Sequence, residues 1–369
     1  MSLLDLLENK KVVMAAGPGG VGKTTTSATI GLALAQRGKR VCVVTVDPAK
    51  RLAEALGVTL DNSPSKVECD VEGELHAMML DARATFEGFI RRDAPSPDVA
   101  ERLLNNVIYN ELAGAMAGTL EYAAVEKLHE LYQSDAYDVV VIDTPPSKNV
   151  IDFLDAPQYV TRFLDEKIFK WFVLLDPNRP VKGLTASLLK RTGKIVWELI
   201  GQIFGSDFAT QLSQFMLAME SYVTTFRGRA EMIEGLMRSP STAFVVITSP
   251  DDAVLEDAAY LCREIRSRGI PFQGFVVNRT YTDPGFENAK DWELDFQEAG
   301  LERPDWSDLI ERVKGELKLQ ELRLKRQDAS LRHLRSASAW AGAVVRIPWQ
   351  GEDLNELKDL EALIPHLDS

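Results

Sequence analysis

Residues 17–24 constrain the fold of this chain most strongly, because they spell Gly-Pro-Gly-Gly-Val-Gly-Lys-Thr, the G-x-x-x-x-G-K-T pattern of a phosphate-binding loop. The apolar run 11–16 before the loop predicts a buried strand. The stretch 24–36 after it predicts a helix that stops near Gly38. Strand, glycine-rich loop and helix in this order are the context that such a loop requires, and they favour it over a glycine-rich turn that binds nothing.

The residue types in this loop each suit a phosphate ligand. Glycines let successive backbone N–H groups approach phosphate oxygens without a Cβ clash, and the helix N-terminus adds partial positive charge. Lys23 is expected to reach the β- and γ-phosphates, and the Thr24 hydroxyl is expected to ligate Mg²⁺. We therefore predict that ATP or ADP binds here with Mg²⁺. The predicted nucleotide-binding residues of the loop are Gly17, Gly19, Gly20, Val21, Gly22, Lys23, Thr24 and Thr25.

Composition excludes several other classes of protein. The chain has 369 residues, of which 45% are hydrophobic and 26% charged, as in soluble globular proteins. Its net charge of −13 argues against a nucleic-acid-binding surface. No run of about 18 uncharged apolar residues occurs, and residues 1–11 lack the features of a signal peptide, so we expect no stable membrane insertion. Three widely spaced cysteines predict a reducing, cytoplasmic location and no metal cluster within one chain.

Short apolar runs rich in β-branched residues alternate with helical patterns along the chain. Such runs, with helices between them, predict an α/β fold: a P-loop NTPase with a mostly parallel sheet covered by helices on both faces. Ligands then gather where the strands end. Beyond the first strand, the expected strands are residues 40–46, 75–80, 137–142, 242–248, 272–277 and 343–347.

Two blocks between these strands have apolar residues at helical spacing and almost no strand pattern. They predict an inserted α-helical subdomain. A charged, helix-like tract also begins at about Asp305. The predicted P-loop ATPase domain comprises residues 1–95, 133–155 and 240–369, and the helical subdomain comprises residues 96–132 and 156–239.

The helical subdomain is unusually rich in methionine and aromatic residues. For most of its apolar residues, from Trp171 to Met237, the core of a helical bundle is the favoured interpretation. Adaptable Met-rich surfaces also bind apolar partners. Our hypothesis is an apolar groove for a hydrophobic protein client or partner helix, which nucleotide opens or closes.

Three polar residues follow predicted strands on the nucleotide side. Asp143 ends the run YDVVVI and is placed to hold Mg²⁺, directly or through a water. Asp47 is placed to orient or deprotonate the attacking water, so that Asp47 and Lys23 are the predicted catalytic residues. Asn278 offers donor and acceptor groups to a purine edge. An acidic turn residue or helix cap, and a turn asparagine, are the alternatives for these positions.

These motifs together resemble the ArsA-like ATPases, the deviant Walker A group that includes the arsenite-pump ATPase and the tail-anchored-protein targeting factor. A helical stretch at 108–128 is similar to the bacterial branch. The resemblance covers nearly the whole chain. Besides the loop, it is carried by residues 47–52 (DPAKRL), 143–149 (DTPPSKN), 276–279 (VVNR) and 346–348 (RIP).

The resemblance implies an ATPase whose chains pair face to face and whose dimer opens or closes with nucleotide state. It implies that Asp47 is the acid of the first switch segment, and that Asp143 begins the second, which couples Mg²⁺ to the helical subdomain. It also implies that Pro348 and the loop after it flank the base.

The chain departs from this family at three points. Pro18 stands where the family has a lysine that reaches the partner's nucleotide, so that stabilisation either comes from another cation or is absent; Lys50, Arg51 and Lys148 are candidates. The paired-cysteine zinc motif of the eukaryotic targeting factor is missing. The cysteines do not cluster, so the pattern does not support an arsenite site.

The favoured function is therefore a cytoplasmic, Mg²⁺-dependent ATPase that acts as a homodimer, or as a heterodimer with a paralogous ATPase, and changes the shape of its helical subdomain. The alternative is a weakly active or inactive nucleotide-binding partner of a catalytic paralogue, which Pro18 keeps open. A DNA-partition or membrane-switch ATPase would need a basic surface or tail, but residues 351–369 are acidic.

Overall fold

One twisted sheet of eight strands forms the centre of the computed structural model, which describes residues 2–47, 51–115, 119–145, 150–156, 158, 186–283, 306–351, 354 and 356–368. The strands lie in the order β3-β4-β2-β5-β1-β6-β7-β8, and every neighbouring pair is parallel except β3 and β4. The predicted mostly parallel sheet is confirmed. The strands are β1 (Val12–Ala16), β2 (Arg40–Thr45), β3 (Ser65–Lys66), β4 (Glu74–Met79), β5 (Val139–Asp143), β6 (Thr242–Thr248), β7 (Phe272–Thr280) and β8 (Ala343–Pro348).

Alternating side chains of the central strands fill two separate cores, one on each face of the sheet. Val13 and Val141 point into one core, whereas Met14 and Ile142 point into the other. All residues of β1 and β5 are buried, which explains why these strands are uninterrupted apolar runs in the sequence.

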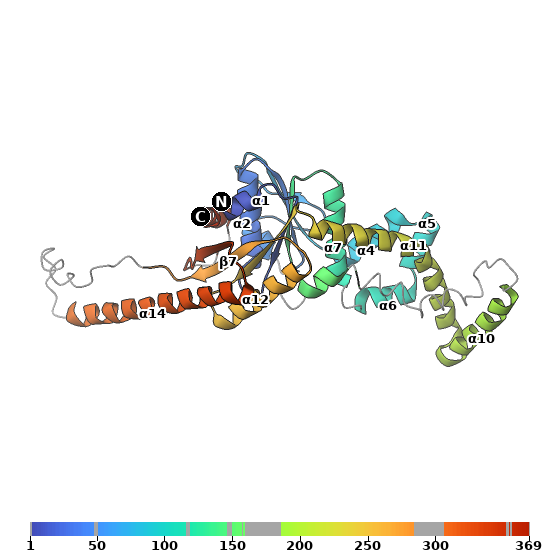
Figure 1. Ribbon diagram of the computed structural model, residues 1–369. Helices are drawn as coiled ribbons and strands as arrows, with labels where there is room; N and C mark the ends of the chain where they lie inside the picture. The colour runs from blue at the N-terminus through green and yellow to red at the C-terminus, as the bar shows by residue number, and fades with distance from the viewer. Residues whose placement is uncertain are drawn as a thin grey trace.

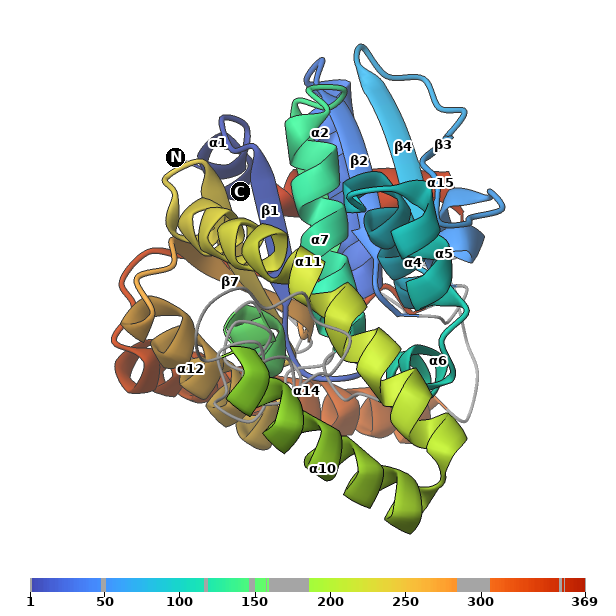
Figure 2. The ribbon, with the colours of Figure 1, turned by 90° about the vertical axis from the view of Figure 1, so that its right-hand side faces the viewer.

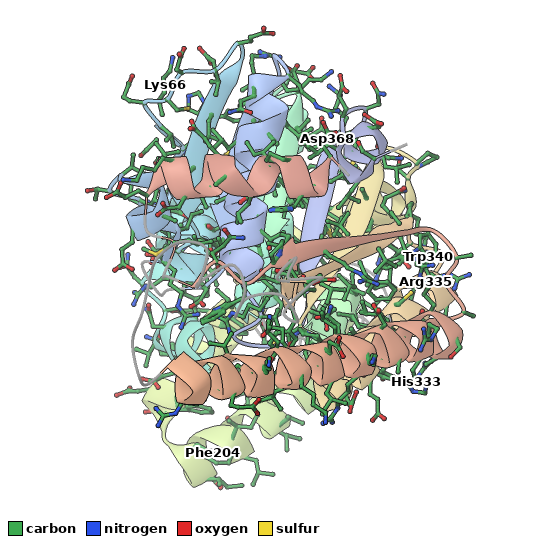
Figure 3. All side chains as sticks on the ribbon, turned by 90° about the vertical axis from the view of Figure 1, so that its left-hand side faces the viewer. Lys66, Phe204, His333, Arg335, Trp340 and Asp368 are labelled. Carbon is green, nitrogen blue, oxygen red and sulfur yellow. The ribbon has the colours of Figure 1, made fainter. Side chains whose placement is uncertain are left out.

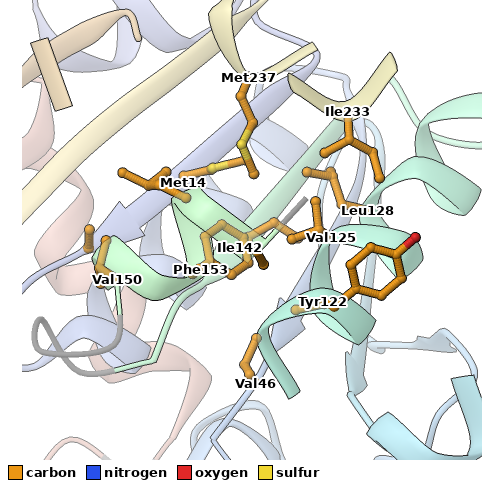
Figure 4. Close-up of a cluster of buried hydrophobic side chains, with 14 of the residues drawn as sticks. Met14, Val46, Tyr122, Val125, Leu128, Ile142, Val150, Phe153, Ile233 and Met237 are labelled. Carbon is orange, nitrogen blue, oxygen red and sulfur yellow. The ribbon is translucent and has the colours of Figure 1, made fainter. Parts of the chain in front are cut away.

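Four helices cover the face of Val13: α1 (Leu3–Leu7), α2 (Lys23–Gln36), α3 (Arg51–Leu56) and α15 (Leu357–Leu367). The other face packs against α4 (Ala82–Asp93), α5 (Pro97–Leu104), α6 (Val107–Ala115), α7 (Thr119–Gln133), α11 (Ser206–Arg238), α12 (Asp252–Ser267) and α14 (Trp306–Ser338). Figure 4 shows this second core, where Tyr122, Val125 and Leu128 of α7 meet Met14 and Ile142 of the sheet.

Two helices of 33 residues each extend the molecule on opposite sides of the sheet (Figure 1). α14 runs out on one side, and α11 crosses from the sheet to α10 (Ala186–Phe204) on the other, as Figure 2 also shows. The chain turns between α10 and α11 at Gly205, which has a φ of +95°.

α11 agrees with the predicted helical block at 156–239, and α14 agrees with the helical tract after Asp305. Residues 159–185 of that block lie outside the described residues. The division into two domains stays a prediction.

A buried charge network ties α11 to α4 and α7. Arg229 of α11 pairs with Asp93 of α4 at 2.7 Å and with Glu126 of α7, whose side chain is only 2% exposed. Arg92 reaches the same Glu126 at 2.9 Å. The Arg229 guanidinium also stacks on the Phe89 ring, with 4.7 Å to the centroid. One arginine therefore holds three helices together.

We predict that Arg229→Ala destabilises the fold by about 3 kcal/mol, because it removes the most buried cation of the network and leaves the buried Glu126 carboxylate with only the more exposed Arg92. The free energy of unfolding in urea measures this. Arg83→Ala is the matched control, since Arg83 makes an exposed pair with Glu87, and such surface pairs contribute little to stability. A loss for Arg229→Ala no larger than for the control would contradict the structural role of the network.

Candidate active site

The glycine-rich loop between β1 and α2 is held by close contacts on two sides. Gly17 has a φ of +155°, and a Cβ there would lie 2.0 Å from the carbonyl oxygen of Ile247 in β6. Gly22 begins α2 with a φ of +92°, and a Cβ there would lie 2.3 Å from the Asn278 side-chain amide. Larger residues do not fit at these positions, so the glycines fix the loop against the sheet.

Lys23 lies buried at the floor of this loop. Its Nζ donates a hydrogen bond of 3.0 Å to the carbonyl oxygen of Pro18. Burial lowers the pKa of Lys23, while the nearby carboxylates of Asp143 and Asp47 oppose that shift. A phosphate oxygen is a stronger acceptor for this ammonium group than a backbone carbonyl, so the lysine is placed to exchange one for the other.

Asp143 sits where three strands meet. It ends β5, and its backbone pairs with Ala15 of β1 on one side and Thr45 of β2 on the other. The hydroxyls of Thr24 and Thr45 both donate to its Oδ2 atom, at 2.7 and 3.0 Å. Burial raises the pKa of Asp143 to about 6, although these two hydrogen bonds lower it.

The donor set at Asp143 fits a magnesium ion. The buried Oδ1 atom has no hydrogen-bond partner among the described residues, and the Thr24 hydroxyl lies on the other carboxylate oxygen. Carboxylate and hydroxyl oxygens are the hard ligands that Mg²⁺ takes beside phosphates. Sequence reasoning did not identify Thr45 as a site residue, because in the sequence it is one of several β-branched residues of a strand.

Asp47 lies two residues beyond the end of β2 and faces the same space. Its backbone N–H donates to the Thr45 hydroxyl at 3.3 Å, and its side chain is half-buried. Residues 48–50 lie outside the described residues, and α3 begins at Arg51.

A bulge in β7 turns Asn278 toward the loop. The pairing of β7 with β8 shifts between Val277 and Thr280, and Arg279 between them has the left-handed φ of +59°. The Asn278 amide donates to the carbonyl oxygen of Val21 at 2.9 Å. Bulges of this kind re-aim side chains beside active sites. Asn278 is thus both a ligand candidate and a support for the loop.

A single cavity of about 800 Å³ collects most of the predicted site residues. That volume lies within the usual range for small-molecule sites. Gly17 and Val21 are absent from its wall; both contact neighbouring strands instead. The predicted residues that line it are Gly19, Gly20, Gly22, Lys23, Thr24, Thr25, Asp47, Asp143, Asn278 and Pro348.

Sequence reasoning missed several residues of this wall. Trp349 is the most conspicuous, because it is 66% exposed beside Pro348 and its backbone N–H donates to the carbonyl oxygen of Thr280 at 3.0 Å. Only the pairing of β7 with β8 brings it to the cavity. The other wall residues not assigned as ligands are Arg51, Glu54, Ala55, Thr144, Arg279, Gln350 and Leu354.

The mostly parallel sheet, the loop and the carboxylates beside it define the class: an α/β protein with the P-loop NTPase fold. Residues 10–294 match the model of the anion-transporting ATPases, so the chain belongs to that family, as the motifs predicted. Among the described helices, none has the length and apolar character needed to cross a bilayer.

Individual relatives are distant. The ATPase ARSA2 of Chlamydomonas reinhardtii is 25% identical over 288 residues, which cover 75% of this chain and 70% of that protein. The ATPase get3 of Aspergillus terreus is 25% identical over 281 residues, which cover 75% of this chain and 76% of the relative. The putative arsenical pump-driving ATPase 1 of Aquifex aeolicus is 24% identical over 282 residues, 73% of this chain and 63% of that one.

We predict that Lys23→Ala weakens the binding of a non-hydrolysable ATP analogue by roughly 10- to 100-fold, because it removes a charge-assisted contact of about 1.5–3 kcal/mol. Calorimetry measures the affinity. Lys318→Ala is the control, since Lys318 is exposed on α14 and lies outside the cavity wall. Equal affinities for wild type and Lys23→Ala would show that the loop does not bind the phosphates.

Proposed function

We propose that this chain is a magnesium-dependent ATPase of the cytoplasm. One observation carries the proposal: Lys23, Thr24, Asp47 and Asp143 come from three separate segments and line one cavity. The family supports ATPase activity in general. All three cysteines are free thiols, which agrees with a reducing compartment.

In the proposed mechanism the backbone N–H groups of the loop and the ammonium of Lys23 hold the phosphates. Thr24 and Asp143 would hold Mg²⁺, which supplies charge neutralisation at the β- and γ-phosphates when bound. Asp47 orients a water whose oxygen bonds to the γ-phosphorus. The bond from that phosphorus to the bridging oxygen breaks, its electron pair leaves with ADP, and the water proton passes to Asp47 or a phosphate oxygen.

We place the base beside Asn278 and Pro348 in the wall of this cavity, where the exposed indole of Trp349 offers an aromatic face for stacking. The Asn278 amide group supplies hydrogen bonds to a purine edge.

We propose that α10 presents the surface for a hydrophobic client. Ile195, Leu199 and Ile203 follow one another at four-residue spacing, and their side chains are 55–63% exposed. Phe204 continues this surface at the outer end of α10, far from the sheet (Figure 3). A cavity of about 640 Å³ lies between α10 and α11 beside it. An apolar surface of this kind marks a place where an apolar partner binds.

The chain would act in a homodimer, or in a heterodimer with a paralogous ATPase. Pro18 favours the second candidate function, a weakly active nucleotide-binding partner, because the proline carries no cation and its carbonyl oxygen instead accepts the Lys23 hydrogen bond.

We predict that Asp47→Asn lowers ATP turnover about a hundred-fold or more, because the amide does not accept the proton of the attacking water. The affinity for the ATP analogue should stay within about tenfold, or ~1.4 kcal/mol. Phosphate release and calorimetry measure the two quantities. Wild-type turnover in Asp47→Asn would limit Asp47 to a structural role. Negligible turnover of the wild-type chain alone, with normal ATP binding, would favour the partner function.

We predict that sedimentation and the fluorescence of a hydrophobic probe differ among the apo, ADP-bound and ATP-analogue-bound states. Leu199→Gln should abolish the probe difference because it breaks the apolar surface of α10. Leu322→Gln is the matched control: its side chain on α14 is 56% exposed, against 55% for Leu199. Identical sedimentation, probe binding and hydrogen exchange over residues 186–238 in all three states would contradict both the nucleotide-driven dimer and the moving client surface.

A further inference from the structure

Arg51 is one of two arginines in the cavity wall, and the mechanism proposed above gives it no role. Arg51 is the first residue of α3, four positions after Asp47, and its side chain is exposed at the cavity wall. No carboxylate within the described part of the chain makes an ion pair with it. An exposed guanidinium that faces a cavity without a carboxylate partner is free to take an anionic ligand.

Arg51 lines the same cavity wall as Lys23 and Asp47. Arg279, the other arginine of the wall, follows Asn278 on β7 and so belongs to the part of the wall where we place the base. Lys23 and Arg51 are therefore the described cations of the wall on the Asp47 side.

We propose that Arg51 binds the γ-phosphate of ATP within the same chain and supplies the positive charge that Pro18 lacks. The inference rests on the proposed ATPase function. A guanidinium binds two phosphate oxygens at once in a fixed geometry, which an ammonium group does not. Beside Asp47 it also meets the charge that develops as the γ-phosphoryl group leaves ADP. Arg51 is thus a catalytic residue that touches the transferred group.

The consequence is a preference for ATP over ADP. ADP lacks the γ-phosphate, so it loses the Arg51 contact but keeps those of the loop. We expect Arg51→Ala to weaken the binding of a non-hydrolysable ATP analogue by about 10- to 100-fold and to leave ADP affinity within about twofold. In Arg51→Ala, turnover should fall by at least the same factor. Arg51→Lys should lose less ATP-analogue affinity and less turnover than Arg51→Ala, because lysine keeps the positive charge but not the paired N–H donors of the guanidinium.

Calorimetry with the ATP analogue and with ADP tests this on four variants. Arg312→Ala, exposed on α14, should change neither affinity. Arg279→Ala should change the two affinities in parallel. The role of Arg51 would be overturned if Arg51→Ala kept the wild-type preference for ATP over ADP. It would also be overturned if Arg279→Ala, and not Arg51→Ala, lost that preference. If the wild-type chain binds neither nucleotide, the proposed function itself is wrong. Wild-type binding with an unaltered Arg51→Ala preference refutes only the role of Arg51.

Mixing distinguishes action within one chain from action across a dimer. Arg51→Ala has an intact loop, and Lys23→Ala has an intact Arg51. If Arg51 acts within its own chain, a mixture of the two variants stays as inactive as its components. Recovery of turnover on mixing would show that the arginine serves the partner's nucleotide and would overturn the proposal.

Discussion

Thr24 and Thr45 donate hydrogen bonds to the same carboxylate oxygen of Asp143, and this junction fixes the geometry of the whole site. It joins the first residues of α2, the end of β2 and the end of β5. The pairing of β5 with both β1 and β2 creates this junction, because the parallel register places Asp143 beside Ala15 and Thr45. Burial of one carboxylate therefore organises the loop, the predicted catalytic residue Asp47 and the proposed metal site together.

The strand order explains why the ligand residues converge. β1 lies between β5 and β6, with β2 beyond β5 and β7 beyond β6, so the ends of five neighbouring strands surround the loop. Ligand sites of open α/β sheets form at such carboxyl ends. The chain beyond Asp143 continues to Val150 and Phe153, which are buried in the core shared by α7 and α11 (Figure 4). A displacement at Asp143 would therefore reach α11, which follows α10 and its proposed client surface in the chain.

Sequence reasoning found what depends on local pattern. Apolar runs such as 242–248 mark strands because both faces of the sheet are covered, and Asp47 and Asp143 stand out as charges that follow such runs. The loop is recognisable in part because two of its glycines, Gly17 and Gly22, are required by contacts that leave no room for a Cβ. The roles of these site residues nevertheless stay predictions.

The features that sequence reasoning missed depend on contacts between segments that are far apart in the chain. Thr45 has the appearance of any strand residue until β5 places a carboxylate beside it. Trp349 is one tryptophan among six until β8 pairs with β7. The two-residue β3 carries no periodicity at all, because two residues are too few to show an alternation. The strained backbone of Arg279 follows from a register shift that no local pattern encodes.

The central claim is that Asp143 and Thr24 form a magnesium site that is completed by nucleotide. Electron paramagnetic resonance of Mn²⁺, a spectroscopic substitute for Mg²⁺, tests it directly. With a non-hydrolysable ATP analogue, the wild-type chain should bind Mn²⁺ and immobilise its signal, and Asp143→Ala should weaken that binding at least about tenfold. The same Mn²⁺ affinity and spectrum in wild type and Asp143→Ala would contradict the account.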